Sequence, residues 1–295
     1  MRDPLERIAA GEILLFDGAI GTMIMARGLQ PGRPPESFNL SRPEVLEEVA
    51  RLYIEAGAEF VTTNTFGASP IKLRHYGQDN EAEMINTAGV EAARAAAEGR
   101  AYVAASIGPT GAILRPYGDA EPEEVYDGFK LQAAAMAAAG ADIFVVETMI
   151  DLAEAKLAVK AARDAAPRIP VMATMTFDPT PRGYFTVMGV TVAQAADGLA
   201  AAGADIVGSN CGNGIERMIE IAVEFKNHTK MPIAIQSNAG LPITRDGEVV
   251  YPETPEFMAY KANELINLPV SIIGGCCGTT PKHVRSIRAV IDSAR

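Results

Sequence analysis

Ala139-Gly-Ala-Asp142 stands directly before Ile143-Phe-Val-Val-Glu147, so a glycine is followed at once by an apolar run. The pattern occurs twice more, as Ala56-Gly-Ala-Glu59 before Phe60-Val-Thr-Thr-Asn64 and as Ala202-Gly-Ala-Asp205 before Ile206-Val-Gly-Ser-Asn210. Glycine is common just after a helix because it adopts left-handed backbone angles without strain. The three repeats therefore predict helices that turn directly into strands.

Five further apolar runs complete the set of candidate strands: residues 13–16, 102–106, 171–175, 233–236 and 270–273. All of the runs are continuously apolar, as in parallel strands that are covered on both faces. Strands that alternate with helices over a chain of 295 residues predict a (β/α)8 TIM barrel. An open, doubly wound sheet is the alternative. We see no linker or change in composition, so we expect residues 1–295 to form a single domain.

Capping patterns indicate where several of the helices begin. Capping-box spacing occurs in Ser41-Arg-Pro-Glu44, Asp151-Leu-Ala-Glu154 and Thr191-Val-Ala-Gln194. Thr254-Pro255 and Thr280-Pro281 each place an N-cap residue before a proline at the first helical position. We therefore expect each of these five patterns to open a helix, with its first residue as the N-cap.

The predicted connections differ in length between the two ends of the barrel. Helix-to-strand turns are short, whereas four strand-to-helix loops are long: residues 18–40, 66–80, 177–189 and 239–253. The last of these contains Arg245-Asp-Gly-Glu248, a hairpin signal between Ile243 and Val250. Because barrel enzymes carry their active sites at the carboxyl ends of the strands, we expect the functional site among these long loops.

The chain has three cysteines, and each follows a predicted strand. Cys211 stands in Gly208-Ser-Asn-Cys-Gly212, and Cys276 and Cys277 stand in Gly274-Gly-Cys-Cys-Gly278. Successive side chains on a strand point to opposite faces, so adjacent thiols can reach one ion only where the backbone leaves strand geometry. The flanking glycines permit such a turn. Three thiolates predict a zinc site whose fourth position is open to substrate, as in catalytic rather than structural zinc centres.

Two other interpretations of these thiols remain open. Free cysteine is often a small buried apolar residue, so three unrelated core thiols are the first alternative. A disulfide between Cys276 and Cys277 is the second, although adjacent residues would close a strained ring. The position of the thiols at strand ends, within glycine turns, favours the metal.

Polar side chains at the ends of several predicted strands suggest a common site: Asp17, Asn64, Glu147, Cys211, Asn238 and Cys276. Glu147 ends an apolar strand, where a buried carboxylate requires a cation or several hydrogen-bond donors. Asp17 precedes a glycine turn, and ordering that turn is an equal alternative for it. The histidines show no ligand spacing, and we expect His228 and His283 on helix surfaces.

Composition excludes several classes of protein. A chain that is 48% apolar is not disordered, and no apolar run approaches the length of a membrane span. The net charge of −11 argues against nucleic acid as a partner. The amino terminus lacks a secretory signal pattern, and few, apparently unpaired cysteines suit a cytoplasmic location. Neither a Walker A motif nor a dinucleotide fingerprint is present.

Taken together and in order, the motifs resemble the homocysteine S-methyltransferase family. They are Asp17-Gly-Ala-Ile-Gly-Thr22, Thr63-Asn-Thr-Phe66, Glu147, Asn210-Cys-Gly212, Ser237-Asn-Ala-Gly-Leu-Pro242 and Gly274-Gly-Cys-Cys-Gly-Thr-Thr-Pro281. The resemblance covers nearly the whole chain. Through residues 237–242 it is nearest to the homocysteine-binding domain of cobalamin-dependent methionine synthase. The family implies a (β/α)8 barrel that carries zinc on three cysteines.

The resemblance also implies an activity, namely zinc-dependent methyl transfer to the thiol of L-homocysteine to give methionine. Cys211, Cys276 and Cys277 would hold Zn²⁺ together with the substrate sulfur. Glu147 would bind the substrate ammonium and is counted with the cysteines as catalytic, and Asp17 would assist it.

Further residues are assigned by the same resemblance. The substrate carboxylate would be bound by the backbone amides of the turn from Gly18 to Thr22 and by the end of the second strand, at Thr63 and Asn64. Asn238 would be an oxygen ligand of zinc when substrate is absent.

The expected methyl donor is methylcobalamin, presented by a separate corrinoid protein or module and not tightly bound to this chain. The chain ends after its expected last helix, without folate or cobalamin modules and without the C-terminal extension of betaine-dependent relatives. We therefore expect either a lone domain or a piece of a larger synthase. S-methylmethionine and betaine are the alternative donors. A thiol- or zinc-based sensor of an amino acid or a metal is the non-enzymatic alternative.

Overall fold

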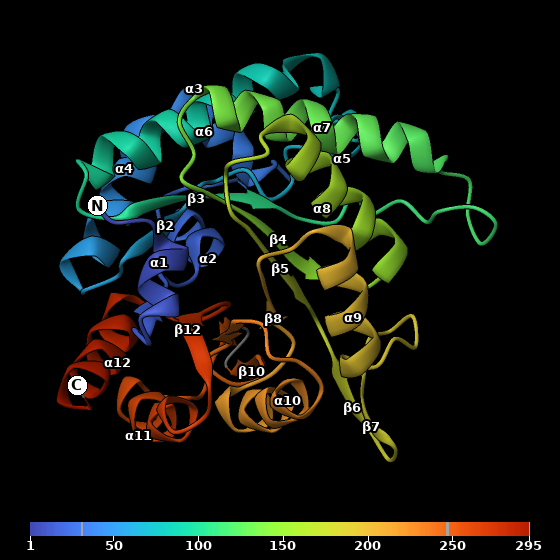
Figure 1. Ribbon diagram of the computed structural model, residues 1–295. Helices are drawn as coiled ribbons and strands as arrows, with labels where there is room; N and C mark the ends of the chain where they lie inside the picture. The colour runs from blue at the N-terminus through green and yellow to red at the C-terminus, as the bar shows by residue number, and fades with distance from the viewer. Residues whose placement is uncertain (31, 246–247, 295) are drawn as a thin grey trace.

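A sheet of eight parallel strands forms the centre of the computed structural model, which describes residues 1–30, 32–245 and 248–294 (Figure 1). The strands follow the order β1-β12-β9-β8-β5-β4-β3-β2, which is the order of a (β/α)8 barrel. Their bounds are β1 (Leu14–Leu15), β2 (Phe60–Thr62), β3 (Tyr102–Ile107), β4 (Ile143–Met149), β5 (Val171–Met175), β8 (Ile206–Asn210), β9 (Ile233–Ser237) and β12 (Val270–Gly275). The predicted barrel is confirmed, and the open sheet is excluded.

The longer helices cover the outside of the barrel, as Figure 1 shows. They are α4 (Pro43–Glu55), α6 (Ala82–Ala97), α7 (Pro122–Ala138), α8 (Leu152–Ala165), α9 (Val192–Ala202), α10 (Ile215–His228), α11 (Pro255–Ile266) and α12 (Pro281–Ser293). Shorter pieces are α1 (Pro4–Ala9), α2 (Ile20–Met25), η1 (Pro35–Ser37), α3 (Phe38–Ser41), α5 (Pro70–Arg74) and η2 (Asp79–Glu81). None of the helices in the described residues is both long and apolar enough to cross a bilayer.

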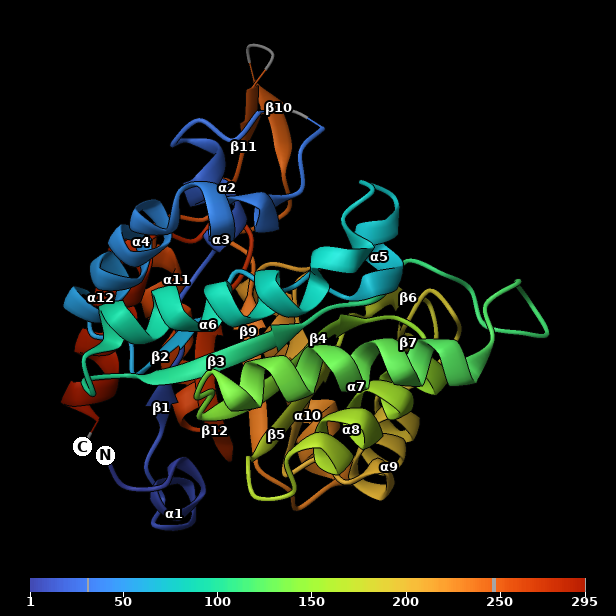
Figure 2. The same ribbon diagram turned by 90° about the horizontal axis from the view of Figure 1, so that it is seen from above.

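Two hairpins extend the loops at the carboxyl ends of the strands. They are β6 (Asp178–Thr180) with β7 (Gly183–Phe185), and β10 (Ile243–Arg245) with β11 (Glu248–Val250). The second pairs Ile243 with Val250, which confirms the predicted hairpin; its turn residues, 246–247, lie outside the described residues. Figure 2 shows β10 and β11 projecting from the end of the molecule opposite α1.

The capping patterns predicted most of the helix starts correctly. Thr191 and Gln194 form the predicted capping box. Asp151 caps α8 through the Ala153 amide, but Glu154 bonds to Thr110 rather than back to the cap.

The prediction that Ser41 caps a helix is wrong. Ser41 ends α3, and its hydroxyl donates to the Ser37 carbonyl, so Arg42 becomes the N-cap of α4. Residues 38–41 already form a helical turn, and the Ser41 hydroxyl, which was expected to cap the next helix, bonds within that turn instead.

His283 is buried, contrary to its predicted place on a helix surface. Its Nδ1 atom accepts from the Thr280 amide at 3.1 Å, and Nε2 lies 3.0 Å from the Glu253 carbonyl. This pattern requires the neutral ring with its proton on Nε2, and burial lowers the pKa of His283 accordingly. The residue joins the start of α12 to the segment before α11.

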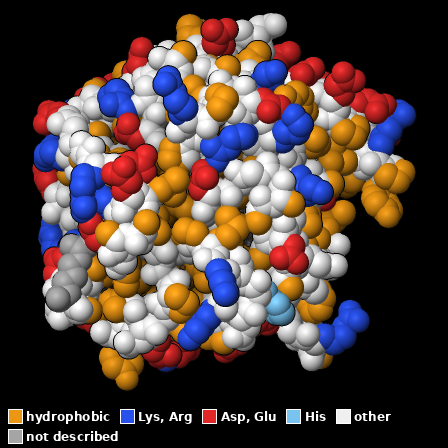
Figure 3. Space-filling view, in the orientation of Figure 1, with side chains coloured by type: hydrophobic (Ala, Val, Ile, Leu, Met, Phe, Trp, Pro, Cys, Tyr) orange, Lys and Arg blue, Asp and Glu red, His pale blue; other side chains and the backbone are white. Residues whose placement is uncertain are grey.

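The barrel interior is filled by apolar side chains from alternate strand positions. Phe16 and Phe60 stack with their ring centroids 4.7 Å apart, and Ala104, Val145 and Met172 belong to the same buried cluster. Leu5 and Ile8 of α1 pack against this cluster, so the short amino-terminal helix closes the lower end of the barrel (Figure 2). On the face that Figure 3 shows, acidic and basic side chains are interspersed rather than gathered into one charged area.

The seam between β1 and β2, where the barrel closes, is held by two carboxylates. Near the lower end, the Glu59 amide donates to the Leu15 carbonyl at 2.8 Å, and Glu59 Oε2 accepts from the Leu15 amide at 3.1 Å. Near the upper end, Asp17 Oδ2 accepts from the Thr62 amide at 2.7 Å, and Oδ1 accepts from the Thr62 hydroxyl at 2.7 Å. Side chains thus complete the hydrogen bonding where the backbone ladder is short.

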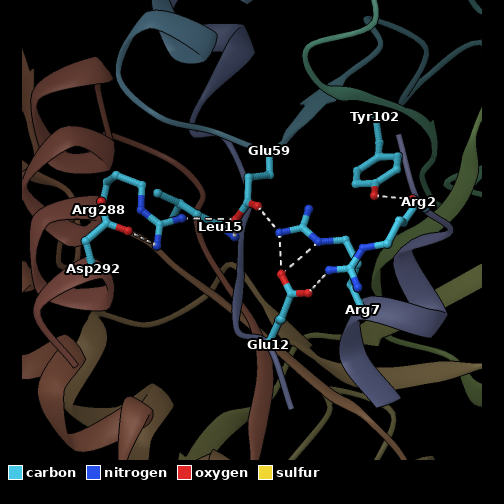
Figure 4. Close-up of polar contacts among 8 residues, drawn as sticks. All are labelled: Arg2, Arg7, Glu12, Leu15, Glu59, Tyr102, Arg288 and Asp292. Atoms are coloured by element: carbon cyan, nitrogen blue, oxygen red, sulfur yellow. Dashed lines mark hydrogen bonds and ion pairs between the residues drawn. The ribbon is translucent and has the colours of Figure 1, made fainter. Parts of the chain in front are cut away.

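Glu59 is also the centre of an ion-pair network (Figure 4). Arg7 of α1 and Arg288 of α12 both pair with its carboxylate, and Arg7 pairs in addition with Glu12. The arginine side chains are only about 15% exposed, at 14% and 15%. The network joins α1 and α12 to the seam, and its partial burial makes the loss of one partner more costly than in an exposed pair, because the remaining charge is left poorly solvated.

We predict that Glu59→Gln destabilises the barrel. Glutamine keeps the shape but loses the charge that both arginines share, and hydrogen bonds to charged groups contribute about 1.5–3 kcal/mol. Urea unfolding should show a loss of free energy in that range. Glu44→Gln, in an exposed pair with Arg42, is the matched control and should change stability by less than about 0.5 kcal/mol. Equal stability of the two variants would contradict the role assigned to the seam.

Candidate metal centre

The three cysteine sulfurs meet at the carboxyl ends of β8 and β12. All three Sγ atoms lie within 4.8 Å of one another, and those of Cys211 and Cys277 are 3.9 Å apart. Tetrahedral zinc with Zn–S bonds of about 2.3 Å places its sulfurs about 3.8 Å apart. The cluster therefore fits a zinc ion with three thiolate ligands, and all three cysteines are free.

Backbone hydrogen bonds to β9 fix the positions of Cys211 and Cys276 along the barrel axis. The Cys211 amide donates to the Gln236 carbonyl at 3.1 Å, and the Cys276 amide donates to the Ser237 carbonyl at 2.8 Å. Cys211 itself has a φ of +61°, a conformation that strains a residue other than glycine by about 1–3 kcal/mol. β12 ends at Gly275, so the chain leaves strand geometry just before the paired thiols, as predicted.

Glu147 lies at the same rim, on a strand that bulges. The register of β4 against β5 shifts between Val146 and Met149, and Thr148 has a φ of +60°. Glu147 Oε1 accepts from the Ser106 hydroxyl at 2.5 Å. Burial raises the pKa of Glu147 to about 7, and within residues 1–30, 32–245 and 248–294 it has no ion-pair partner. A carboxylate in this setting suits a cationic group of a ligand.

Asn210 joins Glu147 to the thiols, and the sequence analysis did not select it as a site residue. Its Oδ1 accepts from the Thr148 amide at 2.7 Å and from the Thr174 hydroxyl at 2.8 Å. Its Nδ2 donates to Glu147 Oε2 at 3.2 Å and lies 4.0 Å from Cys276 Sγ. The signals in the sequence were its place at the end of a strand, directly before Cys211, and its presence in the motif Asn210-Cys-Gly212.

Asp17 and Gly18 lie beside the cluster but are built into the barrel. Both Asp17 oxygens accept from Thr62, and burial raises the pKa of Asp17 to about 7. A Cβ on Gly18 would lie 2.6 Å from Thr279 Oγ1 and 3.0 Å from the Tyr53 ring, so only glycine fits there. The Asp17 side chain thus bonds to β2, and neither the expected ordering of its glycine turn nor the expected contact with substrate is tested by these bonds.

The structure places Thr63 and Asn64 in the loops behind the rim. The Thr63 hydroxyl accepts from the Ser106 amide at 3.1 Å, and its own amide donates to Ala104. Asn64 Nδ2 donates to the Pro35 carbonyl and to Asn39 Oδ1, both at 2.8 Å. These contacts orient Ser106 and anchor the first loop, so the polar groups expected to meet the substrate are largely engaged within the protein.

Asn238 lies close to the backbone of the cysteines. Its amide donates to the Asn213 carbonyl at 3.0 Å, and the next amide, that of Ala239, donates to the Cys277 carbonyl at 2.9 Å. Asn238 Oδ1 is buried and has no hydrogen-bond partner among the described residues. The expected role of Asn238 as an oxygen ligand of the metal stays a prediction.

Comparison with known proteins finds relatives over nearly the whole chain. A family model described as homocysteine S-methyltransferase matches residues 14–291. The methionine synthases of Mycobacterium tuberculosis (strain ATCC 25618 / H37Rv) and Mycobacterium leprae (strain TN) are each 33% identical and are matched by 98% of this chain. The chain spans 25% of the length of each of these relatives.

Solved structures show the same fold. The homocysteine methyltransferase MmuM from Escherichia coli, in its metallated form, matches with a TM-score of 0.80 at 24% identity. The match covers 97% of this chain and 99% of that one. The apo form of the same protein matches with a TM-score of 0.75 at 22% identity. At this level of identity the likeness establishes the shared barrel.

We predict that the protein binds one Zn²⁺ per chain and that Cys276→Ala releases most of it. Removing one of three thiolates leaves too few ligands for a stable site. Metal analysis after dialysis measures the zinc content, and far-ultraviolet circular dichroism checks that the barrel, which has its own core, is retained. Stoichiometric zinc in a folded Cys276→Ala protein would refute the three-thiolate site.

Proposed function

This chain belongs to the homocysteine S-methyltransferase family, and from that premise we propose that it methylates the thiol of L-homocysteine to give methionine. The observation that carries the proposal is the thiol cluster with an unpaired carboxylate at the same rim. Three thiolates suit Zn²⁺ and leave one tetrahedral position for the substrate sulfur. Glu147 supplies a negative charge for the substrate ammonium.

Zn²⁺ held by Cys211, Cys276 and Cys277 would supply the positive charge that favours the thiolate form of an added thiol at neutral pH. The three cysteine thiolates would place negative charge around the metal. This charge would keep the substrate sulfur electron-rich enough to attack a methyl group. No protein base is needed at the methyl carbon. The chain's own contribution is therefore to position the substrate and to exclude competing nucleophiles.

Glu147 is proposed to bind the ammonium of homocysteine. Ser106 and Asn210 each donate to one of its oxygens, which orients the carboxylate and leaves lone pairs for a charged donor. The substrate carboxylate is proposed to meet amides between Gly18 and Thr22, where Ala19 makes no side-chain cap for α2, although its own amide donates to Thr279 Oγ1 at 3.2 Å. Asp17 assists by holding this turn beside β2, through its hydrogen bonds to Thr62.

The proposed methyl donor is methylcobalamin on a separate corrinoid protein or module. The proposal is supported by the 33% identity to two methionine synthases. This chain spans 25% of the length of each, so each has room for further modules. The mouth also offers exposed apolar side chains: Met25 of α2, and Leu241, Ile243 and Val249 in or beside the β10–β11 hairpin. Figure 2 shows α2 and this hairpin at the same end of the molecule. Such a surface suits a bulky donor.

We predict methionine formation from homocysteine and methylcobalamin by the zinc-loaded protein. A methylated corrinoid protein should be a much better donor than the free cofactor, because docking converts a bimolecular encounter into a positioned one. Methylcobalamin, S-methylmethionine and betaine should be compared side by side in one assay. Turnover with S-methylmethionine or betaine alone would overturn the donor but keep the thiolate mechanism, whereas homocysteine binding without any turnover would favour a sensor.

We predict that Glu147→Gln weakens homocysteine binding. The variant keeps the shape but loses a charge-assisted hydrogen bond of about 1.5–3 kcal/mol, so the dissociation constant should rise about 10- to 150-fold. 4-Mercaptobutanoate, which lacks the amino group, should bind both proteins equally. Calorimetry with the two ligands separates the outcomes: equal weakening of both would show that Glu147 acts on the structure of the site instead.

A further inference from the structure

Strand β4 contains a bulge near its carboxyl end. Val146 and Met149 pair with Ala173 and Met175 of β5. Two residues of β4 lie between these pairs, opposite a single residue of β5, which is the arrangement of a β-bulge. Bulges are rare between parallel strands and are frequent next to active sites. The second residue of this one, Thr148, has a φ of +60°, which a β-branched residue adopts only where its surroundings hold it there.

The bulge decides which way the side chains at the end of β4 point. Val145 belongs to the cluster that fills the barrel interior, and Glu147, two positions further on, lies on the same face of the strand. In a regular strand Met149 would follow on that face, but it belongs with Val146 to the apolar cluster shared with the surrounding helices. Without the bulge, either an apolar side chain would enter the mouth or the Glu147 carboxylate would turn into the apolar layer.

Asn210, at the end of β8, contacts both residues of the bulge. Its Oδ1 accepts from the Thr148 amide at 2.7 Å, and its Nδ2 donates to the Thr148 hydroxyl at 2.8 Å. Nδ2 also donates to Glu147 Oε2 at 3.2 Å. Because a backbone amide can only donate, the Thr148 amide fixes which side of the Asn210 group carries its oxygen. Asn210 thus supplies an acceptor for the amide of a residue that has left the regular ladder of the sheet.

Asn210 is itself held in place by β5 and the residue that follows it. The Thr174 hydroxyl donates to Asn210 Oδ1 at 2.8 Å, and the Thr176 hydroxyl donates to the Asn210 carbonyl at 2.9 Å. The Thr176 amide donates to the Met149 carbonyl at 2.9 Å, so the bonding between the two segments resumes directly after the bulge. Asn210 is fully buried. A buried amide that is hydrogen-bonded at both ends has a single orientation and can impose one on its partners.

We propose that Asn210 is a positioning residue: it holds Thr148 in the bulged conformation and thereby keeps the Glu147 carboxylate directed into the mouth of the barrel. The inference rests on the proposed function, in which Glu147 binds the substrate ammonium, and deepens it. It goes beyond the direct hydrogen bond to Glu147, because the main effect passes through the backbone of the next residue. Thr148→Gly should therefore compensate in part for the loss of Asn210, since glycine adopts a positive φ without strain.

The test compares the wild-type protein with Asn210→Ala, Thr148→Gly and the double variant. Asn86→Ala is the matched control, because Asn86 is also fully buried and its side chain donates to two backbone carbonyls, but it lies on α6. Hydrogen exchange detected by NMR measures the opening of the Thr148 amide without any ligand. Calorimetry then measures the binding of homocysteine and of 4-mercaptobutanoate to the zinc-loaded proteins, after their metal content has been checked.

In Asn210→Ala we expect the Thr148 amide to exchange about three- to tenfold faster, as the loss of one hydrogen bond implies. Homocysteine should bind about 10- to 100-fold more weakly, whereas the affinity for 4-mercaptobutanoate should change less than about threefold. Adding Thr148→Gly should restore the homocysteine affinity by about threefold or more. Asn86→Ala should keep the exchange rate of the Thr148 amide and the ligand preference of the wild type.

An unchanged exchange rate at Thr148 in Asn210→Ala would overturn the proposal, because Asn210 would then not hold the bulge. Equal weakening of both ligands would also overturn it, since that result would indicate a loosened metal centre. So would a double variant without any recovery, which would leave only the direct bond to Glu147. If the wild-type protein bound homocysteine no more tightly than 4-mercaptobutanoate, the proposed role of Glu147 would fail, and the exchange rate would still decide whether Asn210 holds the bulge.

Discussion

Hydrogen bonding from β9 to both of its neighbours is the constraint on which the thiol cluster depends. Gln236 and Ser237 lie at the end of β9, and their carbonyls accept from the amides of Cys211 and Cys276, which follow the flanking strands. A slip of one residue in either pairing would turn a thiol to the other face of the sheet. The parallel register thus brings Cys211 next to Cys276 and Cys277, which follow it in the chain by 65 and 66 positions.

A line of buried polar groups connects this cluster to the other half of the barrel. Asn210 bridges the thiols and Glu147, and Ser106 continues the line to Thr63 behind β2. Groups in such a network are costly to bury unless each is satisfied, and when satisfied they specify one arrangement. The two carboxylates at the rim differ in this respect. Asp17 is engaged on both oxygens by the barrel seam, whereas Glu147 retains capacity for a cation.

The loop after β9 combines an anchored segment with a projecting hairpin. The anchored segment from Tyr251 to Glu253 lies against Gly278 and the start of α12, while the neighbouring hairpin is exposed and apolar. The anchored part is held by hydrogen bonds from three segments, whereas the projecting part exposes apolar side chains. The chain corresponds to a quarter of its methionine synthase relatives, and its thiol cluster lies at the end of the barrel from which this hairpin projects.

The barrel and its reactive rim were predictable from the sequence, because continuous apolar runs, helix-ending glycines and cysteines after strands are local signals. The roles of Asn210 and Glu59 were not, and His283 was placed wrongly on the surface. Each of these side chains has a partner in a segment far away in the chain: β4 for Asn210, α12 for Glu59, and the segment before α11 for His283. Patterns over three or four residues predict the local secondary structure of a segment. Strand register and barrel closure decide which side chains from distant segments come into contact. The sequence alone therefore determined the fold and the end of the barrel where the three thiols gather, and the tertiary structure decided which distant side chains surround and orient them.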